Sequence, residues 1–185
     1  MEMLIIDDRT KRQETDLGKG LEHDLYSMLI SMAPAVSFCS SIESFNELDP
    51  FKYIAVHRSF VVQNLNLEDL ISYIHRTDKY LILFSGGINE KTVGLNGHYL
   101  SLNSKFFYSD RLVKFVEYIR DGEVPNLYQL LYGQSWKLPL LLRYRHLQWQ
   151  GPITDEDINW MEDIEEILPE TVNVDESIES LLRSM

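Results

Sequence analysis

The fold of this chain is decided by residues 3–8, which read MLIIDD. Four apolar residues run directly into two adjacent carboxylates, Asp7 and Asp8. A short and continuous apolar run predicts a strand that is covered on both faces, as in the middle of a parallel sheet. In open α/β folds ligands bind at the carboxyl ends of such strands, so the acidic pair is a candidate site.

Four further apolar runs predict strands, at residues 35–40, 53–56, 80–84 and 98–102. Apolar residues at helical spacing predict helices between them, at 22–32, 42–48, 67–76 and 110–120. Residues 58–66 are expected to form a loop, and a short helix at 89–97 would fit the alternation. Because parallel neighbours need crossover connections, this order predicts an α/β fold: a five-stranded parallel sheet flanked by helices on both faces.

The composition changes after residue 122, so we expect a first domain at residues 1–122 and a mainly helical C-terminal extension at 123–185. Helices are predicted at 127–132, 154–168 and 176–182, the second with Thr154 as its N-cap and an acidic first turn. Residues 137–149 combine apolar, aromatic and basic side chains. They are expected to form the core of the extension, with Arg143 and Arg145 facing the acidic helix; stacking on single-stranded nucleic acid is the alternative.

The net charge of −12 is concentrated in an acidic tail that begins at residue 151. Residues 151–185 carry 11 acidic residues against one basic residue, Arg183, which gives −10 and leaves −2 for residues 1–150. This acidity argues against nucleic acid as a partner. A single cysteine, Cys39, no basic and apolar leader, and no apolar run near the roughly 20 residues of a membrane span predict a cytoplasmic protein without a membrane partner.

Polar residues follow four of the predicted strands. Asp7 and Asp8 follow the first strand, His57 the third, Ser85 the fourth and Lys105 the fifth. In this order and strand context, residues 1–120 resemble the receiver domains of two-component response regulators. Those domains carry an acidic pair, a phospho-accepting Asp, a Ser or Thr, and a Lys at these places. The resemblance implies a flavodoxin-like or receiver-like fold with a phospho-acceptor pocket at the five positions.

Two residues depart from the receiver pattern. His57 stands at the place of the phospho-accepting Asp, and Phe106 stands where receivers usually have proline. Adjacent carboxylates suit Mg²⁺, but a neutral imidazole is a poor ligand for this ion. The resemblance therefore implies a degenerate pseudo-receiver with no catalytic residue and no resident cofactor. Mg²⁺, if it binds at all, is expected to bind weakly at Asp7 and Asp8.

The expected function is that of an atypical, phosphorylation-independent receiver-like module for signalling or as an adaptor, not an enzyme. It would act in signal transduction through protein–protein interaction, with a kinase, an effector or a second copy of the chain as partner. Receivers signal through the face of their last strands and last helix. The candidate interface residues there are aromatic, although core packing accounts for some of them: Phe106, Phe107, Tyr108, Phe115 and Tyr118.

A second class of function stays open. A metal-dependent phosphohydrolase or a phosphotransfer protein could use Asp7 and Asp8 with His57, since imidazole suits Zn²⁺ or Mn²⁺ better than Mg²⁺. Haloacid-dehalogenase-type phosphatases also begin with a strand and an Asp nucleophile. They need a second Asp two positions later, where this chain has Arg9.

Overall fold

The computed structural model describes residues 2–7, 25–94, 97–151 and 154–185. The chain divides into two compact units, Met1–Leu130 and Leu131–Met185, and each unit is described by itself. None of the described helices is long and apolar enough to cross a membrane.

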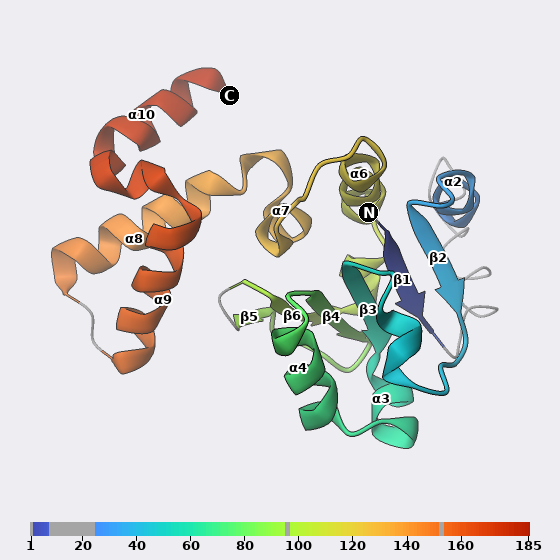
Figure 1. Ribbon diagram of the computed structural model, residues 1–185. Coiled ribbons are helices and arrows are strands. Elements are labelled where there is room, and N and C mark those ends of the chain that lie inside the picture. Colours follow the sequence, from blue (N-terminus) through green and yellow to red (C-terminus); the bar gives the residue numbers. More distant parts are fainter. Residues whose placement is uncertain (1, 8–24, 95–96, 152–153) are drawn as a thin grey trace. The chain divides into compact units, whose positions relative to one another are not determined.

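The first unit is built on one mostly parallel sheet (Figure 1). Its strands lie in the order β2-β1-β3-β4-β6-β5, and only β5 runs antiparallel, beside β6, among the described strands. Their bounds are β1 Met3–Ile6, β2 Val36–Cys39, β3 Tyr53–His57, β4 Tyr80–Ser85, β5 Thr92–Gly94 and β6 Tyr99–Asn103. The α/β class and the five parallel strands are confirmed.

The expected strand count of five is wrong, because the sheet has six strands within the described residues. The additional strand, β5, lies where the sequence had suggested a short helix at 89–97. It contains three residues, and its backbone pairs with β6, so that Val93 lies opposite Leu100. A pattern of three residues is too short to show the alternation that marks a strand.

Helices cover both faces of the sheet, as predicted. In Figure 1, α2 (Leu25–Ser31) and α6 (Asp110–Arg120) lie on one face, and α3 (Arg58–Asn64) and α4 (Leu67–Arg76) lie on the other. The core beneath α3 and α4 joins sheet residues such as Leu4 and Val56 to Phe60 and Leu70 of the two helices. Alternate residues of each central strand therefore bury on opposite faces.

Two segments between strands differ from the prediction. Residues 58–64 form α3 and not a loop; with Phe60 and Val61 as its buried residues, this seven-residue helix is too short for a visible repeat. The helix predicted at 42–48 is a short 3₁₀ helix, η1 (Phe45–Leu48), in which Leu48 is fully buried. By contrast, α4 and α6 have the predicted bounds.

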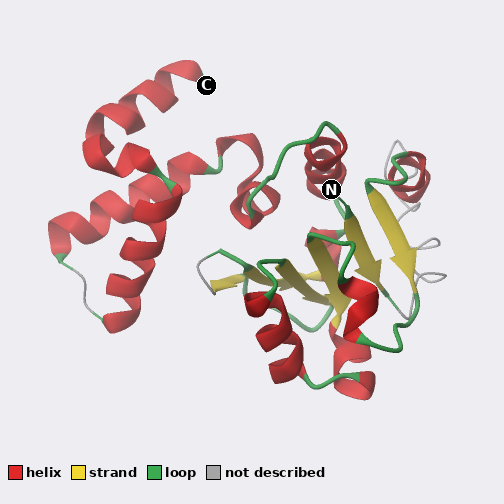
Figure 2. Cartoon of the chain, in the orientation of Figure 1, coloured by secondary structure: helices red, strands yellow, loops and turns green. Residues whose placement is uncertain are grey.

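The second unit consists of helices among its described residues (Figure 2). The elements from the division onward are α7 (Leu127–Tyr132), which the division crosses, then η2 (Gly133–Ser135), α8 (Lys137–Gln150), α9 (Asp155–Ile167), η3 (Pro169–Asn173) and α10 (Val174–Ser184). Thr154 caps α9 as predicted: its hydroxyl accepts a hydrogen bond from the Asp157 amide at 3.1 Å. Arg143 pairs with Asp157 on α9, whereas Arg145 pairs with Asp175 on α10.

Candidate functional site

The carboxyl ends of the central strands meet at one edge of the sheet. Ile6 pairs with Val56, His57 with Phe84, and Ser85 with Asn103. Asp7 follows β1 directly, so the structure places Asp7, His57 and Ser85 at this common edge. Asp8, the second member of the acidic pair, lies outside the described residues.

Asp7 is fully buried, and its carboxylate is held by a tyrosine from far along the chain. The Tyr108 hydroxyl donates a hydrogen bond to Asp7 Oδ2 at 2.8 Å. Tyr108 follows α5 (Ser104–Phe107) and is 4% exposed. Burial, followed by the negative charge of Asp7, raises the pKa of Tyr108 above its ordinary value, so the phenol stays neutral and remains a donor. Asp7 is thus part of a buried hydrogen-bonded pair.

His57 ends β3 and forms the N-cap of α3. Its Nδ1 accepts a hydrogen bond from the Ser59 amide at 3.3 Å and lies 2.6 Å from the Ser59 hydroxyl oxygen. The ring is edge-to-face with Phe84, and the residue is 5% exposed. Because Nδ1 accepts from an amide, the proton of the neutral imidazole is on Nε2. The imidazole is therefore built into the beginning of a helix.

Ser85 and Asn103 fix the loop that follows β4. The Ser85 hydroxyl oxygen accepts a hydrogen bond from the Gly87 amide at 3.3 Å, which closes a turn. The Asn103 side chain donates to the carbonyl oxygens of Gly86 and Ile88 at 3.2 and 3.0 Å. Asn103 was not among the predicted site residues. The pattern of an Asn before a helix was the signal that could have identified it as an N-cap.

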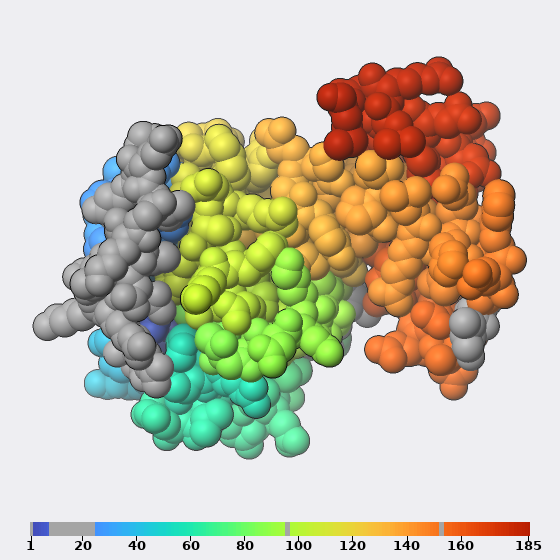
Figure 3. Space-filling view, turned by 180° about the vertical axis from the view of Figure 1, so that it is seen from behind, coloured from blue at the N-terminus to red at the C-terminus, as the bar shows by residue number. Residues whose placement is uncertain are grey.

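Lys105 does not end the last parallel strand. β6 ends at Asn103, whose side-chain oxygen accepts a hydrogen bond from the Lys105 amide at 2.9 Å and begins α5. Lys105 is therefore in the first turn of a helix and is exposed. Figure 3 shows the yellow-green segment that follows β6 reaching the surface on the face seen there. Asn103, not Lys105, is the register neighbour of Ser85.

The five candidate interface residues fall into two groups. Phe107, Tyr108 and Phe115 are at most 4% exposed, and Phe107 stacks on Phe84 with 4.3 Å between ring centroids. They fill the space between the sheet and α6 and leave no surface for a partner. Phe106 and Tyr118 are only partly buried.

The Phe106 ring contacts two cations. The Lys91 ammonium nitrogen lies 3.4 Å from its centroid, and the guanidinium carbon of Arg111 lies 4.8 Å from it. Burial, followed by the charge of Arg111, lowers the pKa of Lys91 from its ordinary value. The surface at Phe106 is therefore both aromatic and positively charged.

The described residues contain no group of three or more His, Cys, Asp or Glu side chains that could hold a metal ion. Asp8 is outside that search, so weak Mg²⁺ binding by the acidic pair stays a prediction. Within the described part, Asp7 and His57 are the acidic and imidazole groups that the sheet brings to neighbouring strand ends. A carboxylate and an imidazole at neighbouring strand ends could transfer a proton or contribute two ligands to an incomplete metal site.

Comparison of the chain with family models, with curated proteins and with solved structures gives no match. The functional argument therefore depends on the sequence pattern and on the geometry of the described residues.

Proposed function

We propose that the first unit is a receiver-like signalling or adaptor module that binds a protein partner without forming an aspartyl phosphate. The strand order supports this proposal. The parallel strands β2-β1-β3-β4-β6 follow the flavodoxin-like order 2-1-3-4-5, with β5 added at the edge. The chain also carries polar side chains at the ends of β1, β3 and β4, where such folds bind ligands.

The observation that carries the proposal is the place of His57. It occupies the end of β3, where the resemblance expects the phospho-accepting Asp, and an imidazole cannot form an acyl phosphate. Its Nδ1 is already bonded to the Ser59 amide, so it caps α3. The side chain thus has a structural use at the very position where a receiver needs a nucleophile.

The environment of Asp7 supports the same conclusion. A carboxylate that is to hold a hydrated metal ion has to face solvent, because Mg²⁺ keeps several of its waters. Asp7 is instead buried and accepts a hydrogen bond from Tyr108. Binding a metal there would require that bond to be replaced.

The surface at Phe106 is the candidate binding surface for the partner, because Phe106 is only partly buried whereas Phe107, Tyr108 and Phe115 are in the core. Its two cations suit an acidic patch on a kinase or an effector, since complementary charges steer association. A second copy of this chain would also offer an acidic surface, because its tail from residue 151 carries a net charge of −10.

The test is incubation of the full chain with acetyl phosphate and Mg²⁺, followed by immediate intact mass measurement at neutral pH, where both an aspartyl phosphate and a phosphohistidine survive. The wild-type chain is expected to keep its mass. His57→Asp is the matched variant, because it restores a carboxylate at the end of β3. Stoichiometric addition of a phosphoryl group to the wild type would overturn the proposal.

The alternative is a metal-dependent phosphohydrolase or phosphotransfer protein, and the shared edge of Asp7 and His57 is the observation in its favour. Metal analysis of the purified chain and a phosphatase assay separate the two functions. Bound Zn²⁺ or Mn²⁺ together with a turnover that His57→Ala abolishes would favour the enzyme.

A further inference from the structure

The surface at Phe106 joins an aromatic ring to several positive charges. The Lys91 ammonium nitrogen and the Arg111 guanidinium carbon lie 3.4 and 4.8 Å from the ring centroid. Lys91, Lys105 and Arg111 are exposed, and the ring is partly buried. Residues 103–114 hold three basic residues against one acidic residue, although the first unit as a whole has a net charge of −5. The surface is therefore a basic patch with an apolar centre on an acidic unit.

Two cations beside one ring repel each other, and a carboxylate from a partner would offset this repulsion. Burial, followed by the charge of Arg111, lowers the pKa of Lys91. Within the described part of the chain, Lys91 contacts the Phe106 ring and forms no ion pair with a carboxylate. The surface thus suits a partner that brings carboxylates together with an apolar side chain to cover the ring.

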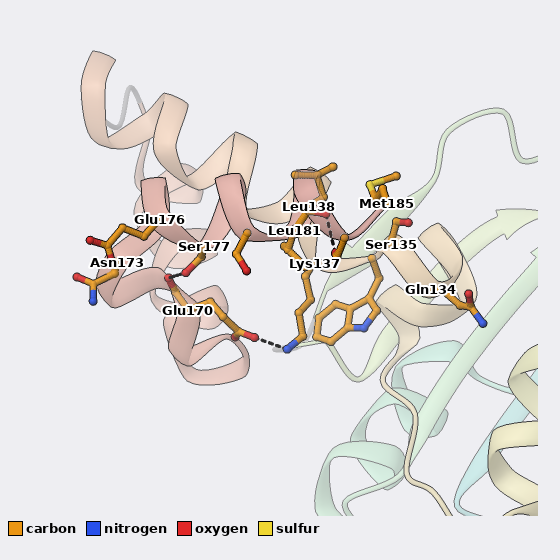
Figure 4. A pocket seen from close by; sticks show the side chains of 13 residues that line it. Gln134, Ser135, Lys137, Leu138, Glu170, Asn173, Glu176, Ser177, Leu181 and Met185 are labelled. Atoms are coloured by element: carbon orange, nitrogen blue, oxygen red, sulfur yellow. Dashed lines mark hydrogen bonds and ion pairs between the residues drawn. The ribbon is translucent and has the colours of Figure 1, made fainter.

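The second unit carries most of its acidic residues on α9. Its cavity, of about 860 Å³, lies between the beginning of α8 and the segment formed by η3 and α10 (Figure 4). Two carboxylates line this cavity, and that of Glu170 is paired with Lys137. By contrast, α9 holds seven acidic residues and no basic residue. The acidic surface that a second copy of the chain offers is therefore mainly that of α9.

One face of α9 complements the surface at Phe106. Ile158 is 43% exposed, although it lies on an acidic helix. Asp155 and Glu162 lie three positions before it and four positions after it, so the three residues share one face of the helix. Both acidic residues are exposed. An apolar side chain flanked by two carboxylates matches an aromatic ring that two cations contact.

We propose that the surface at Phe106 binds helix α9 of a second copy of this chain. Ile158 of one copy packs against Phe106 of the other copy. The two carboxylates that flank Ile158 pair with the two cations at the ring. This inference rests on the proposed function, because it names the partner of the same surface. The contact joins different patches of the two copies, so it can be broken from either side.

The test is sedimentation velocity of the full chain over a range of concentrations, with charge reversal on each side of the contact. The wild type is expected to self-associate, and both Lys91→Glu and Glu162→Lys should raise the dissociation constant at least about tenfold. Both residues are exposed, so the variants are expected to fold, which circular dichroism checks. High salt should weaken the wild-type association, because the contact is largely between charges.

Mixing the two variants separates a contact between copies from a contact within one copy. Lys91→Glu keeps an intact α9, and Glu162→Lys keeps an intact surface at Phe106. An equimolar mixture should therefore associate more tightly than either variant alone. A contact within one copy would not be restored by mixing, and that result would overturn the proposal.

Arg76→Glu and Glu156→Lys are the matched controls. Arg76 is exposed on α4, on the opposite face of the sheet from α6. Glu156 is exposed on α9 but lies two positions from Ile158, so it does not share the face of Ile158. Each control should change the dissociation constant less than about twofold. If a control weakened association as much as the variant with the same charge change, net charge alone would explain the effect and the proposal would be overturned.

Self-association and phosphoryl transfer are measured separately. A wild-type chain that stays monomeric at about 1 mM would overturn the second copy as partner. If that chain also keeps its mass after treatment with acetyl phosphate, the proposed adaptor function stands with a different protein as partner. Stoichiometric phosphorylation of a chain that self-associates as expected would overturn the proposed function and leave this contact in place.

Discussion

The sheet edge of the first unit and the cavity of the second unit use similar polar residues in opposite ways. At the edge, Asp7 and His57 are 0% and 5% exposed, and both side chains are hydrogen-bonded. The cavity of the second unit is lined by residues within 134–138 and 170–185, and two of these residues, Glu176 and Ser180, are exposed. The polar groups of the edge are bonded within the protein, whereas these two side chains of the cavity wall face solvent.

This difference has a physical reason. A buried carboxylate costs several kcal/mol unless hydrogen bonds compensate for lost water, so Asp7 depends on Tyr108. A group held in this way stabilises the fold and is poorly suited to exchange partners during a reaction. Resemblance of the residue pattern at a strand end therefore does not by itself imply the chemistry of a receiver.

The largest effect is expected from removing aromatic packing behind the sheet edge. Phe107 is fully buried and stacks on Phe84, so Phe107→Ala should lower the free energy of unfolding by about 3–5 kcal/mol, measured by urea denaturation. Ser180→Ala in the cavity should change it by less than about 0.5 kcal/mol, as an exposed site does. Similar losses of unfolding free energy in the two variants would contradict the contrast between the buried sheet edge and the exposed cavity wall.

A smaller effect is expected at the cap of α3. His57→Ala removes the acceptor for the Ser59 amide and should cost about 1–2 kcal/mol of stability. His57→Asn keeps a side-chain acceptor and should recover much of this loss. Urea denaturation together with amide hydrogen exchange in α3 measures both variants. If His57→Asn and His57→Ala destabilised the chain equally, His57 would not stabilise α3 as its N-cap.

The smallest effect is a pH dependence in the second unit. Burial, followed by a hydrogen bond to Glu165, raises the pKa of Tyr144 from 10.0 to about 12. Because the pKa in the folded chain is the higher one, this stabilisation is fully present below pH 10 and is lost as pH rises through about 12. Tyr144→Phe should flatten the alkaline loss of stability, whereas Tyr132→Phe, at an exposed tyrosine, should not. If the unfolding free energies of the wild type and of Tyr144→Phe fell in parallel with rising pH, Tyr144 would not be the source of this alkaline loss of stability.

Much of the fold could be predicted from the sequence where the pattern was long or continuous. The runs at 3–6, 53–56 and 80–84 are strands because buried parallel strands are apolar throughout. The helices 67–76 and 110–120 have their predicted bounds because each contains two or more turns of apolar residues at helical spacing. Shorter elements, α3 and β5, gave no readable repeat.

The edge was predictable in part, because parallel strands bring their carboxyl ends together. That rule places Asp7, His57 and Ser85 side by side without any knowledge of contacts. The partner of Asp7 could not be found in this way, because Tyr108 is 101 positions away and lies among other aromatic residues. Lys105 was expected at a strand end, but Asn103 begins a helix there.

The central claim is that Asp7 stabilises the fold through Tyr108 and is not held available for a ligand. A double-mutant cycle with Asp7→Asn and Tyr108→Phe, measured by urea denaturation, tests it most directly. A hydrogen bond to a charged group predicts a coupling free energy of about 1.5–3 kcal/mol between the two sites. Additivity of the two single changes to within about 0.3 kcal/mol would contradict the claim.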